Sequence, residues 1–221
     1  MNGIGRIILD FDNTLFDTDA FKRALSGALV ELGVTREMFW QLYPRVLDHG
    51  GERLGYSPDR HAKLLHELLP DIDPYQASVL LDRVVDRAAD FLFPDAREFL
   101  SRMISLNVPL MLLSRGDEWF QRRKIAASGL DRFVHEIHTG PEAKVKIITT
   151  FPDVSGKTVL VNDHLEETRE ILKIRPTWMP VLKRRLDIPP EKYLSVGMLN
   201  FRTLTEIRDY LTVFHATNAH L

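Results

Sequence analysis

The spacing of hydrophobic positions changes twice along the chain. A short apolar run over residues 4–9 ends abruptly in the polar segment Asp10 to Thr14, which is typical of a buried strand that leads into a loop. From Thr18 to Leu92 the apolar residues recur three and four positions apart, with Pro and Gly between the periodic segments. This spacing predicts a block of helices, and Gly33 ends the first of them.

After Pro94, segments with helical spacing alternate with short apolar segments that favour strands. The alternation predicts a mostly parallel sheet with helices on both faces. We therefore expect an α/β, doubly wound core formed by residues 1–15 and 94–221, into which residues 16–93 are inserted as a separate helical domain. The predicted helices cover about 95–106, 118–128, 144 onward, 165–173 and 203–214, and the predicted strands cover about 108–113, 133–138, 158–161 and 178–182.

Composition narrows the class of protein. The chain has 221 residues, of which 44% are hydrophobic and 27% charged, and these values are typical of folded globular proteins rather than disordered or fibrous ones. A formal net charge of -2 gives no general positive field for a polyanion, so we expect no nucleic-acid partner. Residues 1–15 contain Asp10 and Asp12 and form neither a signal peptide nor a membrane span, so we expect a cytoplasmic protein without a membrane partner.

The absence of cysteine restricts the chemistry. Disulfides, thiolate nucleophiles and cysteine-based zinc sites are all excluded, so catalysis would depend on carboxylates, hydroxyls, lysine, histidine or a hard metal ion. The eight histidines show no spacing typical of a zinc site, although His61 and His66 are close in sequence and His164 adjoins a candidate metal ligand.

Two carboxylates follow the first predicted strand. Asp10 and Asp12 are separated by one residue, and in a turn their charges would repel each other unless a cation or hydrogen-bond donors were present. This arrangement indicates Mg²⁺. An ordinary solvated turn is the alternative for an isolated Asp-x-Asp, but the preceding apolar strand and the following Thr14 and Leu15 favour a functional loop.

A second group of polar residues follows the predicted strand at 108–113. Ser114 supplies a hydroxyl, and Gly116 precedes a predicted helix, so this segment can offer an anion both a side-chain donor and backbone N–H groups. Arg115 either joins this site or faces solvent. Simple capping of the helix by Ser114 or Asp117 is the alternative interpretation.

A lysine and a further carboxylate complete the candidate chemistry. Lys144 or Lys146 begins the next predicted helix and could neutralise phosphate and carboxylate charge. Asp163 follows the apolar strand at 158–161 and could complete a metal shell. Taken singly, these residues are better explained as a surface lysine and a helix cap.

The order of these features resembles that of the haloacid dehalogenase-like (HAD) superfamily of phosphatases and phosphotransferases. The resemblance covers about residues 4–15 and 95–185 and implies a Rossmann-like core, and the helical insertion lies where that family places its type 1 cap. Asp10, Asp12, Thr14 and Leu15 match the first motif, Ser114 the second, Lys144 the third, and Asn162, Asp163 and Glu167 the fourth.

Two positions depart from the usual family pattern. Asn162 stands where many members have Gly or Asp, and Glu167 replaces the second aspartate of the fourth motif. Because Asp163 still supplies one metal ligand, we expect Mg²⁺ binding to be retained, with reduced affinity as an alternative. Lys144 is the preferred third-motif lysine because it precedes a helical apolar pattern, and Lys146 is the alternative.

The resemblance implies a catalytic cycle and a substrate class. Asp10 would be the nucleophile that forms an aspartyl-phosphate, and Asp12 would be the general acid and base. Ser114 and Lys144, with Arg115 and Gly116, would bind the phosphoryl group of a small phosphorylated metabolite. By the same resemblance, Mg²⁺ would be held by Asp10, the backbone carbonyl of Asp12 and Asp163. We expect the protein to act as a monomer or homodimer.

The cap would select the substrate. Candidate contributors are Phe16, Phe21, Phe39, Trp40, Tyr43 and Arg45, although aromatic residues at helical spacing more often belong to the core. A dehalogenase would need neither Asp12 nor a metal. A phosphomutase or phosphotransferase of the same fold, a non-catalytic binding or regulatory protein, and a response-regulator receiver remain as further alternatives.

Overall fold

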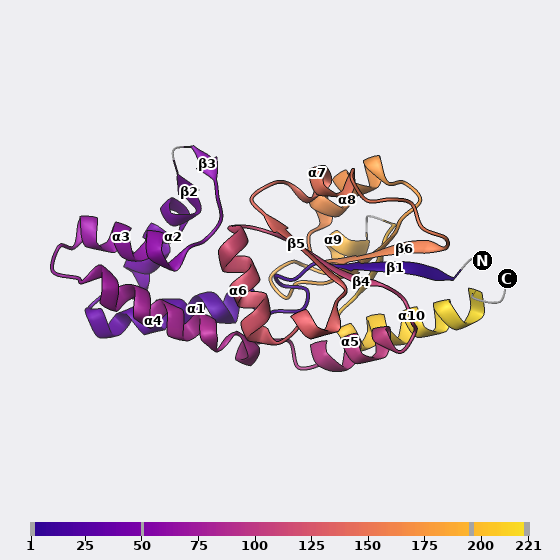
Figure 1. Cartoon of the computed structure of the whole chain (residues 1–221), viewed down its shortest axis with the longest axis horizontal. Helices are drawn as coiled ribbons and strands as arrows, with labels where there is room; N and C mark the ends of the chain where they lie inside the picture. The colour runs from indigo at the N-terminus through magenta and orange to yellow at the C-terminus, as the bar shows by residue number, and fades with distance from the viewer. Residues whose placement is uncertain (1–2, 50, 195–196, 219–221) are drawn as a thin grey trace.

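The computed structural model of the chain describes residues 3–49, 51–194 and 197–218, and its centre is a parallel β-sheet. Six strands in the described residues are arranged in the order β5-β4-β1-β6-β7-β8, and every neighbouring pair is parallel (Figure 1). The predicted α/β class is therefore confirmed. The strands are β1 (Ile4–Leu9), β4 (Leu110–Arg115), β5 (Glu136–Gly140), β6 (Lys157–Asn162), β7 (Met179–Lys183) and β8 (Leu199–Phe201).

Helices cover both faces of this sheet. In Figure 1, α5 and α10 lie below it and α7 and α8 lie above it. The helices of this part of the chain are α5 (Ala96–Ile104), α6 (Glu118–Ser128), α7 (Lys144–Ile148), α8 (Leu165–Ile174), α9 (Glu191–Leu194) and α10 (Leu204–Asn218). The third predicted strand begins at Glu136 rather than near Phe133, because residues 131–133 form a short 3₁₀ helix instead.

The central strand β1 is buried on both faces. Ile7 and Leu9 belong to one hydrophobic cluster, and Ile8 between them belongs to a second cluster on the opposite face. Successive side chains of a strand alternate between faces, so a strand covered by helices on both sides has a continuous apolar sequence. The interruption at Arg6 is accommodated because its guanidinium lies 5.5 Å from the Phe151 ring and 5.7 Å from that of Trp178.

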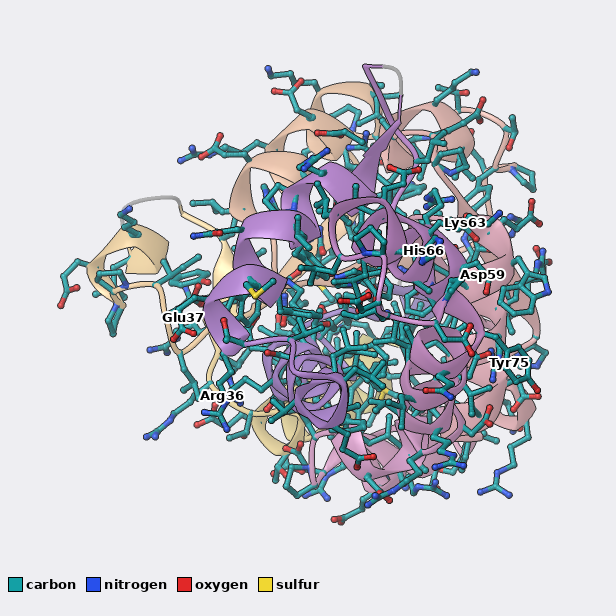
Figure 2. The ribbon with its side chains drawn as sticks, turned by 90° about the vertical axis from the view of Figure 1, so that its left-hand side faces the viewer. Arg36, Glu37, Asp59, Lys63, His66 and Tyr75 are labelled. Carbon is teal, nitrogen blue, oxygen red and sulfur yellow. The ribbon has the colours of Figure 1, made fainter. Side chains whose placement is uncertain are left out.

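The inserted segment forms a helical body beside the sheet (Figure 1). Its outer end carries exposed polar side chains such as Arg36, Asp59 and Lys63 (Figure 2). The segment is not entirely helical as predicted, since a short antiparallel hairpin follows the second helix, where Gly51 adopts a φ of 87° that favours glycine. Its elements are α1 (Thr18–Ala28), α2 (Arg36–Leu47), β2 (Asp48–His49), β3 (Glu52–Arg53), α3 (Pro58–Leu68) and α4 (Pro74–Asp86).

Contacts between the inserted segment and the rest of the chain converge on α6. Arg123 of α6 forms ion pairs with Asp82 and Asp86 of α4. Asp117, the N-cap of α6, pairs with Arg60 of α3 at 3.1 Å. Two of the inserted helices, α3 and α4, are therefore attached to α6, one at its N-cap and the other at Arg123. Among the described residues, no helix is long and apolar enough to cross a membrane.

Candidate active site

The loop after β1 fixes the first two carboxylates. The Asp10 N–H donates to the carbonyl of Val161 in β6 at 2.9 Å, which continues the sheet pairing to the start of the loop. The N–H groups of Leu15 and Phe16 both donate to the carbonyl of Phe11, and Asn13 adopts a φ of 58° that asparagine tolerates better than most residues. The chain therefore reverses tightly, and Asp10 is held at the carboxyl end of a central strand.

Asp10 is buried and bound to a lysine. Its Oδ1 accepts a hydrogen bond from Lys144 Nζ at 2.6 Å, and its Oδ2 accepts one from the Thr14 hydroxyl at 3.0 Å. Lys144 Nζ also lies 2.7 Å from Glu167 Oε2, so one ammonium bridges two carboxylates. The structure thus brings Lys144 into the site. The ammonium of Lys146 instead lies on the surface and pairs with Glu142.

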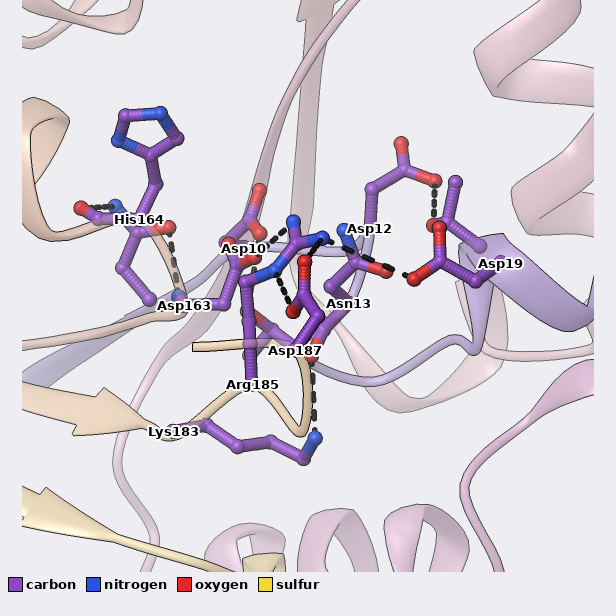
Figure 3. A network of polar contacts seen from close by, with 12 residues as sticks. Asp10, Asp12, Asn13, Asp19, Asp163, His164, Lys183, Arg185 and Asp187 are labelled. Carbon is purple, nitrogen blue, oxygen red and sulfur yellow. Dashed lines mark hydrogen bonds and ion pairs between the residues drawn. The ribbon is translucent and has the colours of Figure 1, made fainter. Parts of the chain in front are cut away.

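Asp163 faces Asp10 from the end of β6 (Figure 3). Burial raises the pKa of Asp10, and the neighbouring charges of Asp163 and Glu167 raise it further, while Lys144 partly offsets both effects. Burial likewise raises the pKa of Asp163, with Lys144 and Arg185 opposing the change. Asp10, Asp163 and Glu167 are therefore crowded around one buried lysine, and this crowding favours the protonated form of Asp10 and Asp163 unless a further cation is bound.

This donor set fits a hard divalent cation. The available ligands are the carboxylates of Asp10 and Asp163 and the main-chain carbonyl of Asp12, all of them oxygen atoms, and a cation would relieve the repulsion between the two carboxylates. In the part of the chain that the structure describes, no three His, Cys, Asp or Glu side chains converge on one point. Two carboxylates and a carbonyl would leave positions for water and substrate, as Mg²⁺ prefers.

Arg185 was not singled out from the sequence, yet it reaches this centre. It follows β7, and its Nη1 lies 3.4 Å from Asp163 Oδ2 (Figure 3). The same guanidinium makes two 2.8 Å contacts with Asp187, which orient it. No motif marked this arginine, and only the parallel pairing of β6 with β7 brings it to Asp163.

The Asp12 carboxylate is directed toward α6 rather than toward Asp163. Its Oδ1 accepts hydrogen bonds from Lys124 Nζ at 2.7 Å and from Thr18 Oγ1 at 2.6 Å, and its Oδ2 accepts one from Gln121 Nε2 at 2.9 Å. Burial alone would raise the pKa of Asp12, but the Lys124 charge and these three hydrogen bonds hold it below its ordinary value. Asp12 is therefore ionised in this arrangement.

Lys124 is itself enclosed by aromatic rings. Its ammonium lies between 5.1 and 5.8 Å from the ring centres of four phenylalanines, and its side chain is 3% exposed. A desolvated cation interacts favourably with aromatic faces, so the rings replace part of its lost hydration. The four rings are those of Phe11, Phe16, Phe21 and Phe120.

Gln121 and Lys124 were missed in the sequence analysis. They lie three residues apart, so they share one face of α6, and both are buried. No signal in the sequence marked them, because the polar and apolar residues of α6 are not segregated onto separate faces and burial cannot be read from such a helix. Their common target, Asp12, is more than 100 positions earlier in the chain, so sequence proximity gave no indication of the contact.

The residues at the end of β4 take different roles. The buried Ser114 hydroxyl lies 3.5 Å from Asp12 Oδ2, so the structure brings Ser114 to the loop that carries the carboxylates. Arg115 and Gly116, the next two residues, line a cavity beside this loop, but the Gly116 N–H donates to the Gly140 carbonyl at 2.8 Å and Arg115 Nε donates to the Pro141 carbonyl at 3.1 Å. In this structure the Gly116 N–H is therefore engaged by the neighbouring strand and not free for an anion.

A cavity of about 520 Å³ lies between the inserted helices and the sheet edge. Asp12, Lys124 and Lys144 line it from the core, and Lys22, Tyr43, Leu47, Gly55 and Tyr56 line it from the insertion. Of the six insertion residues considered from the sequence, Tyr43 lines this cavity. Phe16, Phe21 and Phe39 are instead buried in the hydrophobic core, while Trp40 and Arg45 are exposed elsewhere on the insertion.

Two histidines, His164 and His61, make hydrogen bonds within the protein. His164 caps α8, because its Nδ1 accepts a hydrogen bond from the Glu167 N–H at 3.2 Å. His61 is fully buried in the insertion, where its Nδ1 lies 3.0 Å from the Tyr56 hydroxyl.

Fold and site together define an α/β protein with a buried carboxylate and its lysine partner at the carboxyl edge of a parallel sheet. The chain belongs to the haloacid dehalogenase-like hydrolases, because the model of that family matches residues 4–169. It is thus a hydrolase by family. No curated protein matches the sequence.

Solved structures share the fold at low sequence identity. A haloacid dehalogenase-like hydrolase from Burkholderia xenovorans LB400 is 19% identical, with a TM-score of 0.72 over 95% of this chain and 96% of that one. The HAD-hydrolase YfnB from Bacillus subtilis, a magnesium-bound structure, is 15% identical, with a TM-score of 0.60 over 95% and 99%. L-2-haloacid dehalogenase from Xanthobacter autotrophicus is 14% identical, with a TM-score of 0.62 over 95% and 98%.

Proposed function

We propose that the protein is a Mg²⁺-dependent phosphatase that hydrolyses a small phosphorylated metabolite through an aspartyl-phosphate. The observation that carries this proposal is the second carboxylate, Asp12, which lies two residues after Asp10 and lines the cavity. A nucleophilic carboxylate alone would suit several reactions, but phosphate ester hydrolysis also needs a group that transfers protons to and from the reacting oxygens. Asp12 supplies that group.

In the first step, an Asp10 carboxylate oxygen forms a bond to phosphorus while the bond from phosphorus to the ester oxygen breaks. Lys144, which contacts Asp10 at 2.6 Å, neutralises part of the charge on the carboxylate and the phosphoryl oxygens. Ser114 donates a hydrogen bond to a phosphoryl oxygen. Asp12 gives a proton to the leaving oxygen, so a proton has to reach its carboxylate before this step.

In the second step, Asp12 accepts a proton from a water molecule that attacks phosphorus, and the bond to Asp10 breaks to release inorganic phosphate. The ion pair with Lys124 keeps Asp12 in the ionised form that this step requires. Asp10, Asp163 and the Asp12 carbonyl would hold Mg²⁺, which when bound shields the negative charges of nucleophile and phosphoryl group from each other.

The direct test is phosphate release from p-nitrophenyl phosphate and a panel of phosphorylated metabolites, with and without Mg²⁺. We expect release to require both the metal and Asp10, so that Asp10→Asn is inactive while the exposed matched variant Asp131→Asn behaves as wild type. Equal release by wild type and Asp10→Asn would reject the proposal. Inactivity of both toward the whole panel, with Mg²⁺ still bound, would favour a binding or regulatory role.

A dehalogenase is the second candidate, because similar structures include L-2-haloacid dehalogenases and because Arg185 already places a positive charge beside Asp163. In that reaction Asp10 would displace a halide from carbon, and neither a metal nor Asp12 would be needed. Halide release from 2-chloropropionate in metal-free buffer distinguishes the two. We expect none from this protein.

A further inference from the structure

A second cavity, of about 570 Å³, lies where the chain passes between the sheet and the inserted helices. Its walls come from residues 13–23 on the first passage, residues 93–95 on the return passage, the segment 183–187 after β7, and residues 202–203 after β8. We call this cavity the linker pocket. Its lining shares only Asn13 with that of the 520 Å³ cavity, but Arg185, which lines the linker pocket, also contacts Asp163 at 3.4 Å, so the pocket adjoins the catalytic centre.

The acidic residues of the linker pocket are already engaged. Asp17 caps α1 by accepting from the Ala20 N–H at 2.8 Å, and Asp95 accepts from Thr205 N and Oγ1 at 2.9 and 3.1 Å. Asp187 pairs with Arg185. Asp19 lies 3.8 Å from Arg185 and 3.9 Å from Lys22. The carboxylates of the pocket therefore have cations or N–H donors of their own.

Four positively charged side chains of the linker pocket are not paired with any carboxylate of the described residues. Among the described residues, Lys183, Arg23, Arg184 and Arg202 form no ion pair with a carboxylate, although all four line the cavity. Lys183 is only 5% exposed, and its ammonium is satisfied by the Asn13 carbonyl at 3.2 Å and by the Phe93 ring at 3.4 Å (Figure 3). Arg184 Nε is buried without a hydrogen-bond partner.

The buried member of this set, Lys183, carries a charge that no carboxylate pairs with among the described residues. Buried charges in folded proteins are normally paired, because the hydration that they lose is otherwise not replaced. Consistent with an uncompensated charge, burial lowers the pKa of Lys183 to about 8 despite the more distant Asp163, Asp95 and Asp17. An anion in the linker pocket would supply the missing counter-charge and an acceptor for Arg184.

We propose that the linker pocket, which adjoins the catalytic centre, binds a small polyanion, a molecule with two or more phosphate or carboxylate groups. Lys183 and Arg184 bind one anionic group at the inner wall, and Arg23 and Arg202 bind the other near the rim. Because the walls include both passages of the chain between the sheet and the insertion, the bound ligand links these passages to the ends of β7 and β8. This proposal is independent of the proposed phosphatase activity.

Isothermal titration of the full chain with pyrophosphate and with tricarballylate tests the proposal. Arg23→Gln/Arg202→Gln changes two exposed pocket residues, so the fold should be retained, and Arg36→Gln/Arg83→Gln is a control with the same charge change at exposed positions outside the pocket. We expect the pocket variant to bind at least about tenfold more weakly, as loss of charged hydrogen bonds implies. The control variant and Ser114→Ala should bind as wild type does.

The titrations distinguish a phosphate site from a general polyanion site. Binding of pyrophosphate alone assigns a phosphate ligand, and binding of both anions assigns a more general polyanion site. Wild-type affinity in Arg23→Gln/Arg202→Gln, affinity that is lost instead in Ser114→Ala, or no heat up to about 10 mM of either anion would overturn the proposal. Lys183→Met provides a second pocket variant, with its unfolding temperature measured alongside so that lost binding is not confused with lost folding.

Discussion

Lys124 donates a 2.7 Å hydrogen bond to Asp12 from inside a cage of phenylalanine rings, 112 positions further along the chain. The contact determines where the Asp12 carboxylate points and which protonation state it has. Among the described residues, the only carboxylate that the Lys124 ammonium contacts is that of Asp12, so Lys124 is a positioning residue for Asp12.

Lys124→Met should lower kcat by about 10- to 100-fold, because general acid and base catalysis contributes about 10²- to 10⁴-fold and Asp12 would keep its bonds to Thr18 and Gln121. KM should change little. Removing one partner of a buried ion pair should also reduce the free energy of unfolding by about 3 kcal/mol. Steady-state kinetics and urea unfolding measure both effects. Arg122→Met on the exposed face of α6 is the control, and an unchanged kcat in Lys124→Met would contradict the role.

Lys144→Met should reduce kcat by about 10²- to 10³-fold, the loss typical when one charge-stabilising donor is removed from an active site. The same change at Lys146, whose ammonium pairs with Glu142 on the surface, should leave kcat within the error of the measurement. Phosphate release by the two variants under saturating substrate decides which lysine acts. The reverse result would assign the role to Lys146.

Asp163→Asn should stabilise the metal-free protein by about 1 kcal/mol, since it removes a charge from a crowded carboxylate site, and such sites are commonly destabilising. In wild type, Mg²⁺ at a hundred times its dissociation constant should add about 2.7 kcal/mol, and the variant should lose most of this gain. Thermal unfolding with EDTA and with Mg²⁺ measures both. A less stable metal-free variant would mean that the Arg185 contact outweighs the repulsion.

His61 should make the inserted helices sensitive to acid. Burial lowers its pKa to about 4 from an ordinary value of 6.5, so between these values the unfolded chain binds a proton that the folded chain does not. Stability that is complete above about pH 6.5 should therefore fall by up to about 3 kcal/mol as the pH drops toward 4. Urea unfolding of wild type and His61→Phe at several pH values isolates this contribution. The exposed His66→Asn variant should keep the wild-type dependence.

The sequence predicted those parts of the molecule that depend on local pattern. The sheet, its parallel class and the carboxylates after β1 and β6 could be identified because apolar runs ending in Asp10 and Asp163 are visible in any short window. The short elements α9 and β8 were not predicted, because they have too few residues to show a periodic pattern of hydrophobic positions. Lys124 and Arg185 could not be assigned because their targets are set by which elements pack together, and that depends on the whole fold.

Two neighbouring residues of α6 couple the inserted helices to the candidate active site. Arg123 forms ion pairs with α4, and the next residue, Lys124, binds the Asp12 carboxylate. Successive residues of an α-helix are about 100° apart around its axis, so these two contacts lie on different faces of α6. A twist or slide of this helix displaces both attachments at once. Any reorientation of the inserted helices that displaces α6 would thereby also displace the Asp12 carboxylate, without a separate relay.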